Sequence, residues 1–271
     1  PALWYDTGPG TAAARNYLFG FRARLYAEGF MKTIHDWAAA HGIRSTGHQD
    51  QEEVLNPVSV AGDLMLCGKY MDVPGIDKIG GDRPAELFYK VVSSSAANWD
   101  KRLVMSETFG AMGNIPVREL YTIAMEQYTK GINQLIPHAV WYNDADVTFL
   151  PELSYRNPLY NEALPAFNRF LARLNYLLQP EGRTVADIAM LYPIETLQAG
   201  HYLDGPEGYY AGGVKLPGTD YIRVAAMLSD TLARDFTYLH PEVLARCPAG
   251  RGMLHLDNKV NHQHYRVLIL P

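Results

Sequence analysis

The chain has 271 residues, of which 48% are hydrophobic and 20% are charged, and its formal net charge is −5. This is the composition of a globular protein that can build one large core or two smaller ones. The negative charge and the lack of any run of Lys and Arg argue against a nucleic-acid-binding face, and no apolar stretch approaches the roughly 18–20 residues of a membrane span.

The N-terminal part of the chain alternates short apolar runs with helical patterns. The pattern predicts a short strand within Pro1–Gly10 and a long helix over Ala12–His41, which ends before Gly42 because glycine commonly follows a helix. Further strands are expected at Ile43–His48 and in Asp72–Gly81, where Gly and Pro mark a strand end and its loops. The apolar residues at near-helical spacing in the long helix are Leu18, Phe21, Leu25, Phe30, Ile34 and Trp37.

The alternation continues through the middle of the chain. The expected elements are a helix over Pro84–Trp99, a strand at Lys101–Ser106, a helix from about Val117 to Lys130, a strand at Ile132–Pro137 and a helix over Pro165–Leu178. Such alternation implies βα units on a parallel sheet. Roughly four units fit before residue 180, whereas a closed (β/α)8 barrel needs eight. We therefore expect an α/β fold in which residues 1–180 form the C-terminal half of a TIM-type barrel.

Residues 181–271 have a different character and are expected to form part of a second α/β unit with an open sheet. The pattern predicts strands at Ala186–Tyr192, Phe236–Leu239 and Tyr265–Leu270, and a helix at Tyr221–Leu232. The Gly- and Tyr-rich segment 201–218 lacks the spacing of a nucleotide-binding loop. Because the chain begins at Pro1 and ends on the apolar run Tyr265–Pro271, we expect it to be part of a longer protein.

Glu107 is the strongest candidate for chemistry. It stands where the apolar run Leu103–Met105 meets a glycine-containing loop, and active sites of parallel barrels lie at the C-terminal ends of the strands. A carboxylate there can be a base, a nucleophile or a metal ligand. A structural glutamate that caps a helix or pairs with an arginine fits the same position.

Other candidates follow neighbouring predicted strands. His48, Glu52 and Glu53 come just after one strand, although a charged cluster is more often a solvated loop. Asp77 ends the strand before Glu107, where it could bind substrate or a cation or simply form a turn. His138, Trp141 and Tyr142 follow the next strand, and such aromatic and hydrogen-bonding side chains suit a sugar, although barrel packing explains them equally well.

Several segments together resemble a known family. They are WAAAHGI, STGH with its trailing acids, YMDVPGID, RLVMSETFGA and GINQLIPHAVWY. Their order resembles glycoside hydrolase family 106, the α-L-rhamnosidases, over about residues 1–180. The resemblance implies a catalytic role for Glu107. From Val185 onward, ADIAMLYP, DFTYLHPEVL and YRVLILP are similar to the flavodoxin-like domain that follows the barrel in some β-galactosidases.

The resemblance places the family's other catalytic carboxylate on a strand before Ala12–His41. Glu52 and Glu53 are the candidates within this chain, which we expect to be inactive by itself if the partner lies upstream. The resemblance also implies a calcium ion, although the sequence shows no clear ligand set for it, and no other cofactor is expected. It favours a periplasmic or secreted location, and the two cysteines, Cys67 and Cys247, match no metal spacing.

The sequence therefore predicts a glycoside hydrolase that cleaves plant or microbial polysaccharide, with a carbohydrate as its partner. Inversion with Glu107 as base and retention with Glu107 as nucleophile both remain open. The alternative is a non-catalytic carbohydrate-binding or scaffolding barrel, and a third is a barrel lyase or isomerase. Sugar, linkage and oligomeric state do not follow from the sequence.

Overall fold

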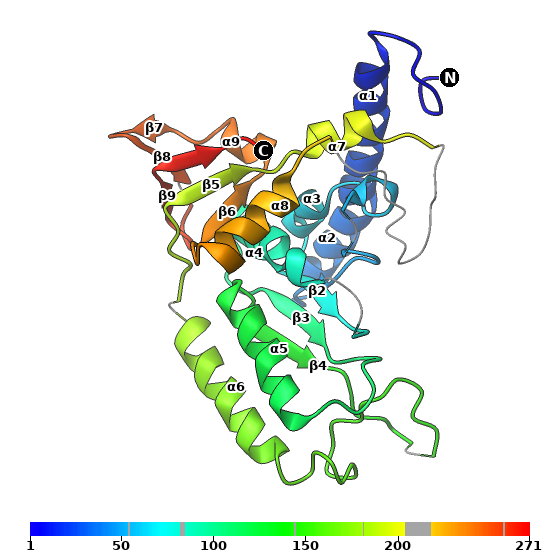
Figure 1. Ribbon diagram of the computed structural model, residues 1–271, viewed down its shortest axis with the longest axis vertical. Coiled ribbons are helices and arrows are strands. Elements are labelled where there is room, and N and C mark those ends of the chain that lie inside the picture. The colour runs from blue at the N-terminus through cyan, green and yellow to red at the C-terminus, as the bar shows by residue number, and fades with distance from the viewer. Residues whose placement is uncertain (54, 82–84, 144, 181, 204–217, 257) are drawn as a thin grey trace.

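The computed structural model describes residues 1–53, 55–81, 85–143, 145–180, 182–203, 218–256 and 258–271. This described part of the chain has a mixed α/β fold with two parallel sheets and one small antiparallel sheet (Figure 1), which confirms the predicted α/β class. Most of the Gly- and Tyr-rich segment 201–218 lies outside the described residues.

The described α-helices are α1 (Thr11–Arg24), α2 (Lys32–Ala40), α3 (Leu64–Lys69), α4 (Tyr89–Asn98), α5 (Val117–Thr129), α6 (Leu164–Leu178), α7 (Ile194–Gly200), α8 (Tyr221–Ala226) and α9 (Pro241–Leu244). Two π-helical segments, η1 (Leu25–Met31) and η4 (Met227–Thr231), and two 3₁₀ helices, η2 (Pro57–Ser59) and η3 (Ala85–Leu87), join them. The described strands are β1 (Thr46–Gly47), β2 (Val73–Lys78), β3 (Met105–Thr108), β4 (Gln134–Pro137), β5 (Ile188–Leu191), β6 (Phe236–Leu239), β7 (Ala249–Gly250), β8 (Met253–Leu256), β9 (Gln263–Tyr265) and β10 (Val267–Ile269).

The first sheet has the strand order β1-β2-β3-β4, and all neighbours are parallel. This sequential order, with a helix before each new strand, is the arrangement expected for consecutive βα units. The predicted strand at Lys101–Ser106 is shifted toward its C-terminus. Strand β3 begins only at Met105. The N–H of Val104, just before it, donates a hydrogen bond to the Asn133 side chain at 2.8 Å.

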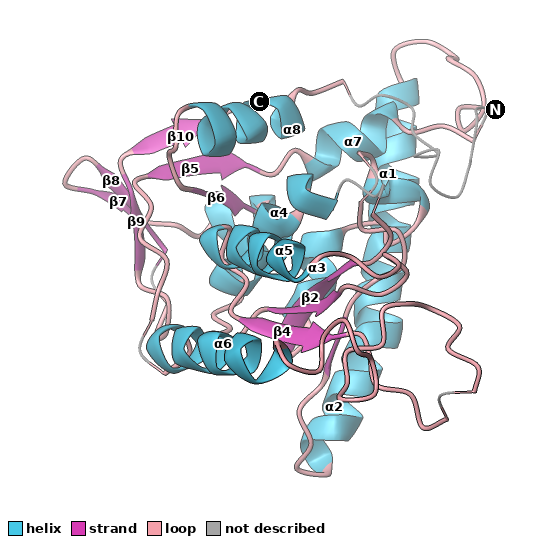
Figure 2. Cartoon of the chain, turned by 60° about the horizontal axis from the view of Figure 1, so that its bottom comes forward, coloured by secondary structure: helices cyan, strands magenta, loops and turns pink. Residues whose placement is uncertain are grey.

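The other two sheets belong to the last third of the chain. The second sheet is parallel with the order β10-β5-β6, and the third is antiparallel with the order β7-β8-β9. Figure 2 shows the third sheet projecting from the end of the second. Helix α4 packs against both β2 and β6, so it lies between the two parallel sheets.

The long helix predicted at Ala12–His41 exists, as α1, η1 and α2 in direct succession. Its orientation differs from the expected one, because the predicted apolar stripe faces solvent: Leu18, Phe21, Leu25, Phe30, Ile34 and Trp37 are all exposed. The buried face instead carries Phe19, Ala23, Ala27 and Ala38. Gly20 on α1 lies against α7, where a Cβ added to it would come 3.1 Å from Gln198 Oε1.

The predicted strand within Pro1–Gly10 was wrong, because the segment forms turns. The Asp6 carboxylate accepts hydrogen bonds from the Gly8 N–H at 2.9 Å and from the Thr11 hydroxyl at 3.0 Å. Such local side-chain bonds compete with strand pairing and favour a turn before a helix.

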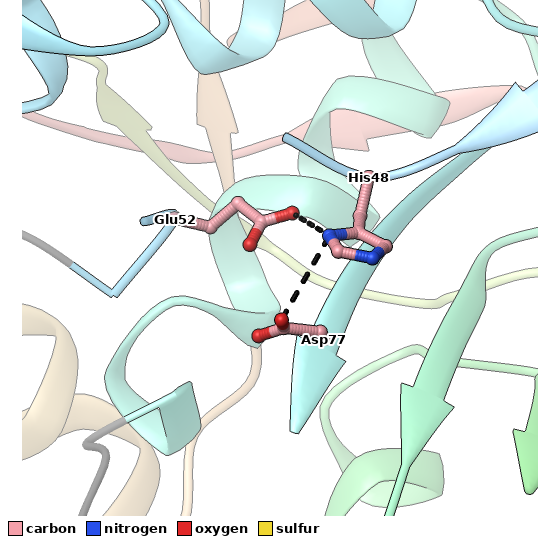
Figure 3. Close-up of side chains that lie close together, drawn as sticks. All are labelled: His48, Glu52 and Asp77. Carbon is pink, nitrogen blue, oxygen red and sulfur yellow. Dashed lines mark ion pairs between the residues drawn. The ribbon is translucent and has the colours of Figure 1, made fainter. Parts of the chain in front are cut away.

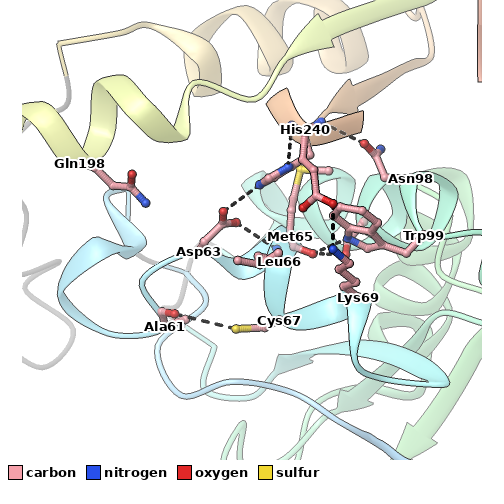
Figure 4. A network of polar contacts seen from close by, with 12 residues as sticks. Ala61, Asp63, Met65, Leu66, Cys67, Lys69, Asn98, Trp99, Gln198 and His240 are labelled. Atoms are coloured by element: carbon pink, nitrogen blue, oxygen red, sulfur yellow. Dashed lines mark hydrogen bonds and ion pairs between the residues drawn. The ribbon is translucent and has the colours of Figure 1, made fainter. Parts of the chain in front are cut away.

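The largest hydrophobic cluster spans both predicted units. It joins Phe19, Val58 and Tyr89 with Tyr192 and Tyr238. Polar contacts cross the same region in Figure 4: Asp63 Oδ2 accepts a hydrogen bond from His240 Nε2 at 2.8 Å. The two parallel sheets therefore share a core.

A second cluster lies between α5 and α6, which run side by side (Figures 1 and 2), and includes Phe109, Tyr160 and Phe167. A third cluster connects Leu239 with the antiparallel sheet through Leu256 and Tyr265. Among the described residues, the helices lack the length and apolar character that crossing a bilayer requires.

Candidate functional site

Four predicted site residues lie at the C-terminal ends of the strands of the first sheet. Asp77 on β2 and Glu107 on β3 are register partners. His48 directly follows β1, and His138 directly follows β4. Because parallel strands end on one edge of the sheet, residues that are distant in sequence meet there. Glu107 and His138 lie on the same side of the sheet, since His138 Nε2 is 3.9 Å from Glu107 Oε1.

His48 is the centre of the cluster. Its Nε2 lies 3.1 Å from Glu107 Oε2, and its Nδ1 lies 3.1 Å from Glu52 Oε1. Figure 3 shows the Glu52 and Asp77 carboxylates both pointing toward this imidazole, with Asp77 Oδ2 3.9 Å from Nδ1. One ring therefore connects two carboxylates from opposite sides, as an imidazolium with two N–H donors can do.

The pKa shifts of His48 and Glu52 agree with that geometry. The hydrogen bond that His48 donates to Glu52 raises the pKa of His48 to about 10, against the opposing effect of burial. Burial raises the pKa of Glu52 to about 7, and its interaction with His48 opposes that rise. The favoured state at neutral pH is a protonated His48 held between Glu52 and Glu107, because separating the buried charge from its partner is costly.

The predicted carboxylates differ in their access to solvent. The Glu107 side chain is 32% exposed and that of Glu52 only 1%. Glu53 lies beside Glu52 on the same loop and is also buried. Glu107 can therefore meet a ligand directly, whereas the buried Glu52 contacts His48. The loop is positioned by Gln49, whose Oε1 accepts a hydrogen bond from the Tyr26 hydroxyl at 2.7 Å.

The aromatic residues after β4 divide into two groups. The Trp141 ring contacts His138 edge-on, with ring centroids 5.1 Å apart. Phe149 also contacts the His138 ring, at 6.4 Å, and was not predicted. Tyr142 is fully exposed, and the structure does not bring it to the His48–Glu107 cluster.

Gly110 is a site residue that sequence reasoning missed. A Cβ added there would lie 2.9 Å from Cγ of His138 and 3.0 Å from Cγ2 of Ile79. The backbone just before it is unusual, because Phe109 has φ +85° although it is not glycine. Such conformations cost energy and are concentrated at functional sites. The Phe109-Gly110 turn thus brings the main chain directly against the His138 ring.

His48, Glu52 and Asp77 could in principle hold a metal ion, since one ligand atom of each lies within 4.8 Å of the others. The set does not fit calcium, which takes six to eight oxygen ligands, whereas this group offers two carboxylates and an imidazole. The Nδ1 atom that would face an ion is instead engaged with Glu52. The arrangement fits a charged hydrogen-bond cluster better than a calcium site.

No family model matches the sequence, and no curated protein matches it.

Proposed function

We propose that the strand ends of the first sheet form part of the active site of a glycoside hydrolase related to family 106. Glu107 is then the carboxylate that acts at the anomeric centre. The observation that carries the proposal is the position of Glu107. It is the partly exposed carboxylate at the strand ends, and it lies between His48 and His138 with Trp141 packed behind. A carboxylate beside hydrogen-bonding and aromatic side chains suits a sugar ring.

In the inverting form of the reaction, a water oxygen attacks the anomeric carbon while Glu107 takes one proton from that water. The glycosidic C–O bond breaks, and a second carboxyl group gives its proton to the leaving oxygen. In the retaining form, Glu107 itself attacks the anomeric carbon as the glycosidic C–O bond breaks, and the second carboxyl group protonates the leaving oxygen. The second carboxylate then takes a proton from the water that hydrolyses the glycosyl ester of Glu107. His48 donates a hydrogen bond to Oε2 in either case and so fixes the carboxylate.

The finer architecture belongs to the same proposal. Residues 1–180 are half of a (β/α)8 barrel, and residues 181–271 are part of a flavodoxin-like unit. Support comes from four sequential parallel strands in the first sheet and from the parallel β10-β5-β6 order of the second. Glu52 and Glu53 are buried, so we assign Glu52 the role of positioning His48 and leave the second catalytic carboxylate to a residue outside this cluster.

The test is Glu107→Gln in the full-length protein, assayed on aryl α-L-rhamnosides and aryl galactosides. Loss of a general base alone lowers turnover by about 10²–10⁴-fold, and loss of a nucleophile lowers it further. Binding of the sugar should largely remain, because the amide keeps the size of the side chain. His138→Ala and Trp141→Ala should act mainly on substrate affinity.

The matched control is Glu119→Gln on the exposed first turn of α5, which should leave turnover unchanged. If Glu107→Gln retains near-wild-type turnover on a substrate that the parent cleaves, Glu107 is structural and the proposal fails.

The second candidate function is a carbohydrate-binding barrel without catalysis. It is favoured by one observation: Glu52 and Asp77, the other carboxylates gathered around His48, are both buried. A binding module would retain sugar affinity, show no turnover in the parent and lose affinity on Trp141→Ala. Calorimetry with free sugars, run beside the turnover assay, separates the two functions.

A further inference from the structure

The antiparallel sheet carries a pair of histidines far along the chain from the strand-end cluster. His255 on β8 and His264 on β9 are directly opposite each other in the ladder. Their neighbours Leu256 and Tyr265 are buried in the third hydrophobic cluster. Because successive strand residues point to opposite faces, the two imidazoles share the outer face of the sheet, where His264 is exposed.

The two rings face each other through their Nδ1 atoms. His255 Nδ1 lies 3.0 Å from His264 Nδ1. The other nitrogen of His255, Nε2, lies 3.1 Å from the Gly250 carbonyl oxygen. A carbonyl can only accept a hydrogen bond, so Nε2 carries the proton and the neutral His255 ring presents the Nδ1 lone pair toward His264.

This is the arrangement of a histidine prepared to bind a metal. Metal-binding histidines commonly donate their other ring N–H to a backbone carbonyl, which fixes the tautomer and the ring orientation. In the metal-free protein, a proton on His264 Nδ1 can bridge the two nitrogens. A metal ion that displaces this proton can bind both imidazoles, which stand on adjacent strands, once the rings turn their Nδ1 lone pairs toward it.

The ligand type also favours particular metals. Imidazole nitrogen suits zinc, copper and nickel, and a given nitrogen site binds Cu(II) most tightly among the divalent first-row metals. Nitrogen ligands in tetragonal geometry indicate Cu(II) or Ni(II).

We propose that His255 and His264 form a two-histidine chelate for a divalent transition metal of the Cu(II) or Ni(II) type, with water completing the coordination. Among the described residues, the only group of three or more metal-ligating side chains is the His48 cluster, so the chelate offers two protein ligands. The site is independent of the proposed glycosidase activity.

The experiment titrates the untagged protein with CuCl₂, NiCl₂ and ZnCl₂ in separate calorimetric runs and records the Cu(II) electron paramagnetic resonance spectrum. Copper should bind most tightly, and its spectrum should show a tetragonal site with two nitrogen ligands. His255→Ala and His264→Ala should each weaken copper binding at least about 10-fold and leave one imidazole nitrogen in the spectrum.

His262→Ala is the matched control, because His262 is an exposed histidine two residues before His264 and should change the affinity less than twofold. His264→Gln keeps a polar side chain on the strand and should reproduce the loss seen with alanine, provided that circular dichroism shows a folded protein. The proposal is overturned if the parent binds no more copper than the His255→Ala/His264→Ala double variant. A copper spectrum that is unchanged in either single variant, or a tetrahedral site, overturns it as well.

Discussion

His48 holds a proton between Glu52 and Glu107, and this has a consequence for the pH dependence of stability. The folded-state pKa of His48 is raised from 6.5 to about 10 by its bond with Glu52. Its stabilising contribution is therefore complete below pH 6.5 and is lost as the pH rises toward 10. Burial raises the pKa of Glu52 from 4.5 to about 7, which makes stability fall with pH in the same direction.

We predict that the free energy of unfolding of the parent declines across pH 6.5–10 by more than that of the His48→Gln/Glu52→Gln double variant. The double change removes both titrating groups while keeping polar side chains of similar size. Urea titrations at pH 6, 8 and 9.5 measure the difference. If the free energy of unfolding changes with pH in the same way in the two proteins, no proton is held at His48.

Gly110 provides a second test at the residue scale. In Gly110→Ala the new methyl group would lie 2.9 Å from His138 Cγ, so the ring or the turn must move. Overpacking of this kind costs about 1–3 kcal/mol of stability. Because His138 belongs to the proposed sugar-binding face, KM should rise more than kcat falls. Gly200→Ala, where a methyl group meets no atom within 4 Å, should leave KM unchanged.

The strand-end argument predicted which residues gather in the candidate site but not the contacts among them. Glu107, His48, Asp77 and His138 could be found because each follows or ends an apolar run. The role of Glu52 could not, since its burial depends on how the loop after β1 folds back. The contact between Gly110 and His138 could not be predicted either, because it joins two loops whose approach is set by the pairing of β3 and β4.

At the scale of elements, α1 buries one of two phenylalanines that are two positions apart in the sequence and exposes the other. Phe19 is 3% exposed and contacts the His201 ring edge-on, whereas Phe21 is 58% exposed. Phe19→Ala should cost about 3–5 kcal/mol of unfolding free energy through the cavity it leaves. Phe21→Ala should change stability by no more than about 0.5 kcal/mol. Chemical denaturation of both variants measures this, and equal losses would contradict the orientation of the helix.

The same helix shows what an apolar pattern can and cannot predict. Leu18, Phe21 and Leu25 recur at a helical spacing, and the helix is present, but periodicity does not say which face meets a neighbour. The buried face includes small residues at close approaches: Ala23 packs against Gly62, and Gly20 lies against Gln198 of α7. The sequence signal for this face is weak, since alanine is also common on exposed helices.

Helix α3 and the β7-β8-β9 sheet were missed for different reasons. Helix α3 is only six residues long and largely apolar, so periodicity could not distinguish it from a buried strand. Asp63 was its available signal, because its side chain accepts a hydrogen bond from the Leu66 N–H as an N-cap. The β7-β8-β9 sheet was missed although Leu254, His255 and Leu256 alternate, because the segment is short and rich in turn residues.

At the scale of the whole molecule, the shared hydrophobic cluster predicts cooperative unfolding. Phe19 and Val58 pack in one cluster with Tyr192 and Tyr238, so the region before residue 180 cannot lose its core while the later region keeps its own. We expect one transition, with the same midpoint by tryptophan fluorescence and by far-UV circular dichroism. Two separated midpoints would show that the two sheets unfold independently.

That shared cluster also bears on how the chain is made in the cell. Val58 leaves the ribosome long before Tyr238, and at about 5–20 residues per second the interval between them is roughly 10–40 s. During this time the apolar residues of the earlier half lack the partners that will cover them. A nascent chain of this kind presents a binding surface to co-translational chaperones, and slower translation would lengthen its exposure.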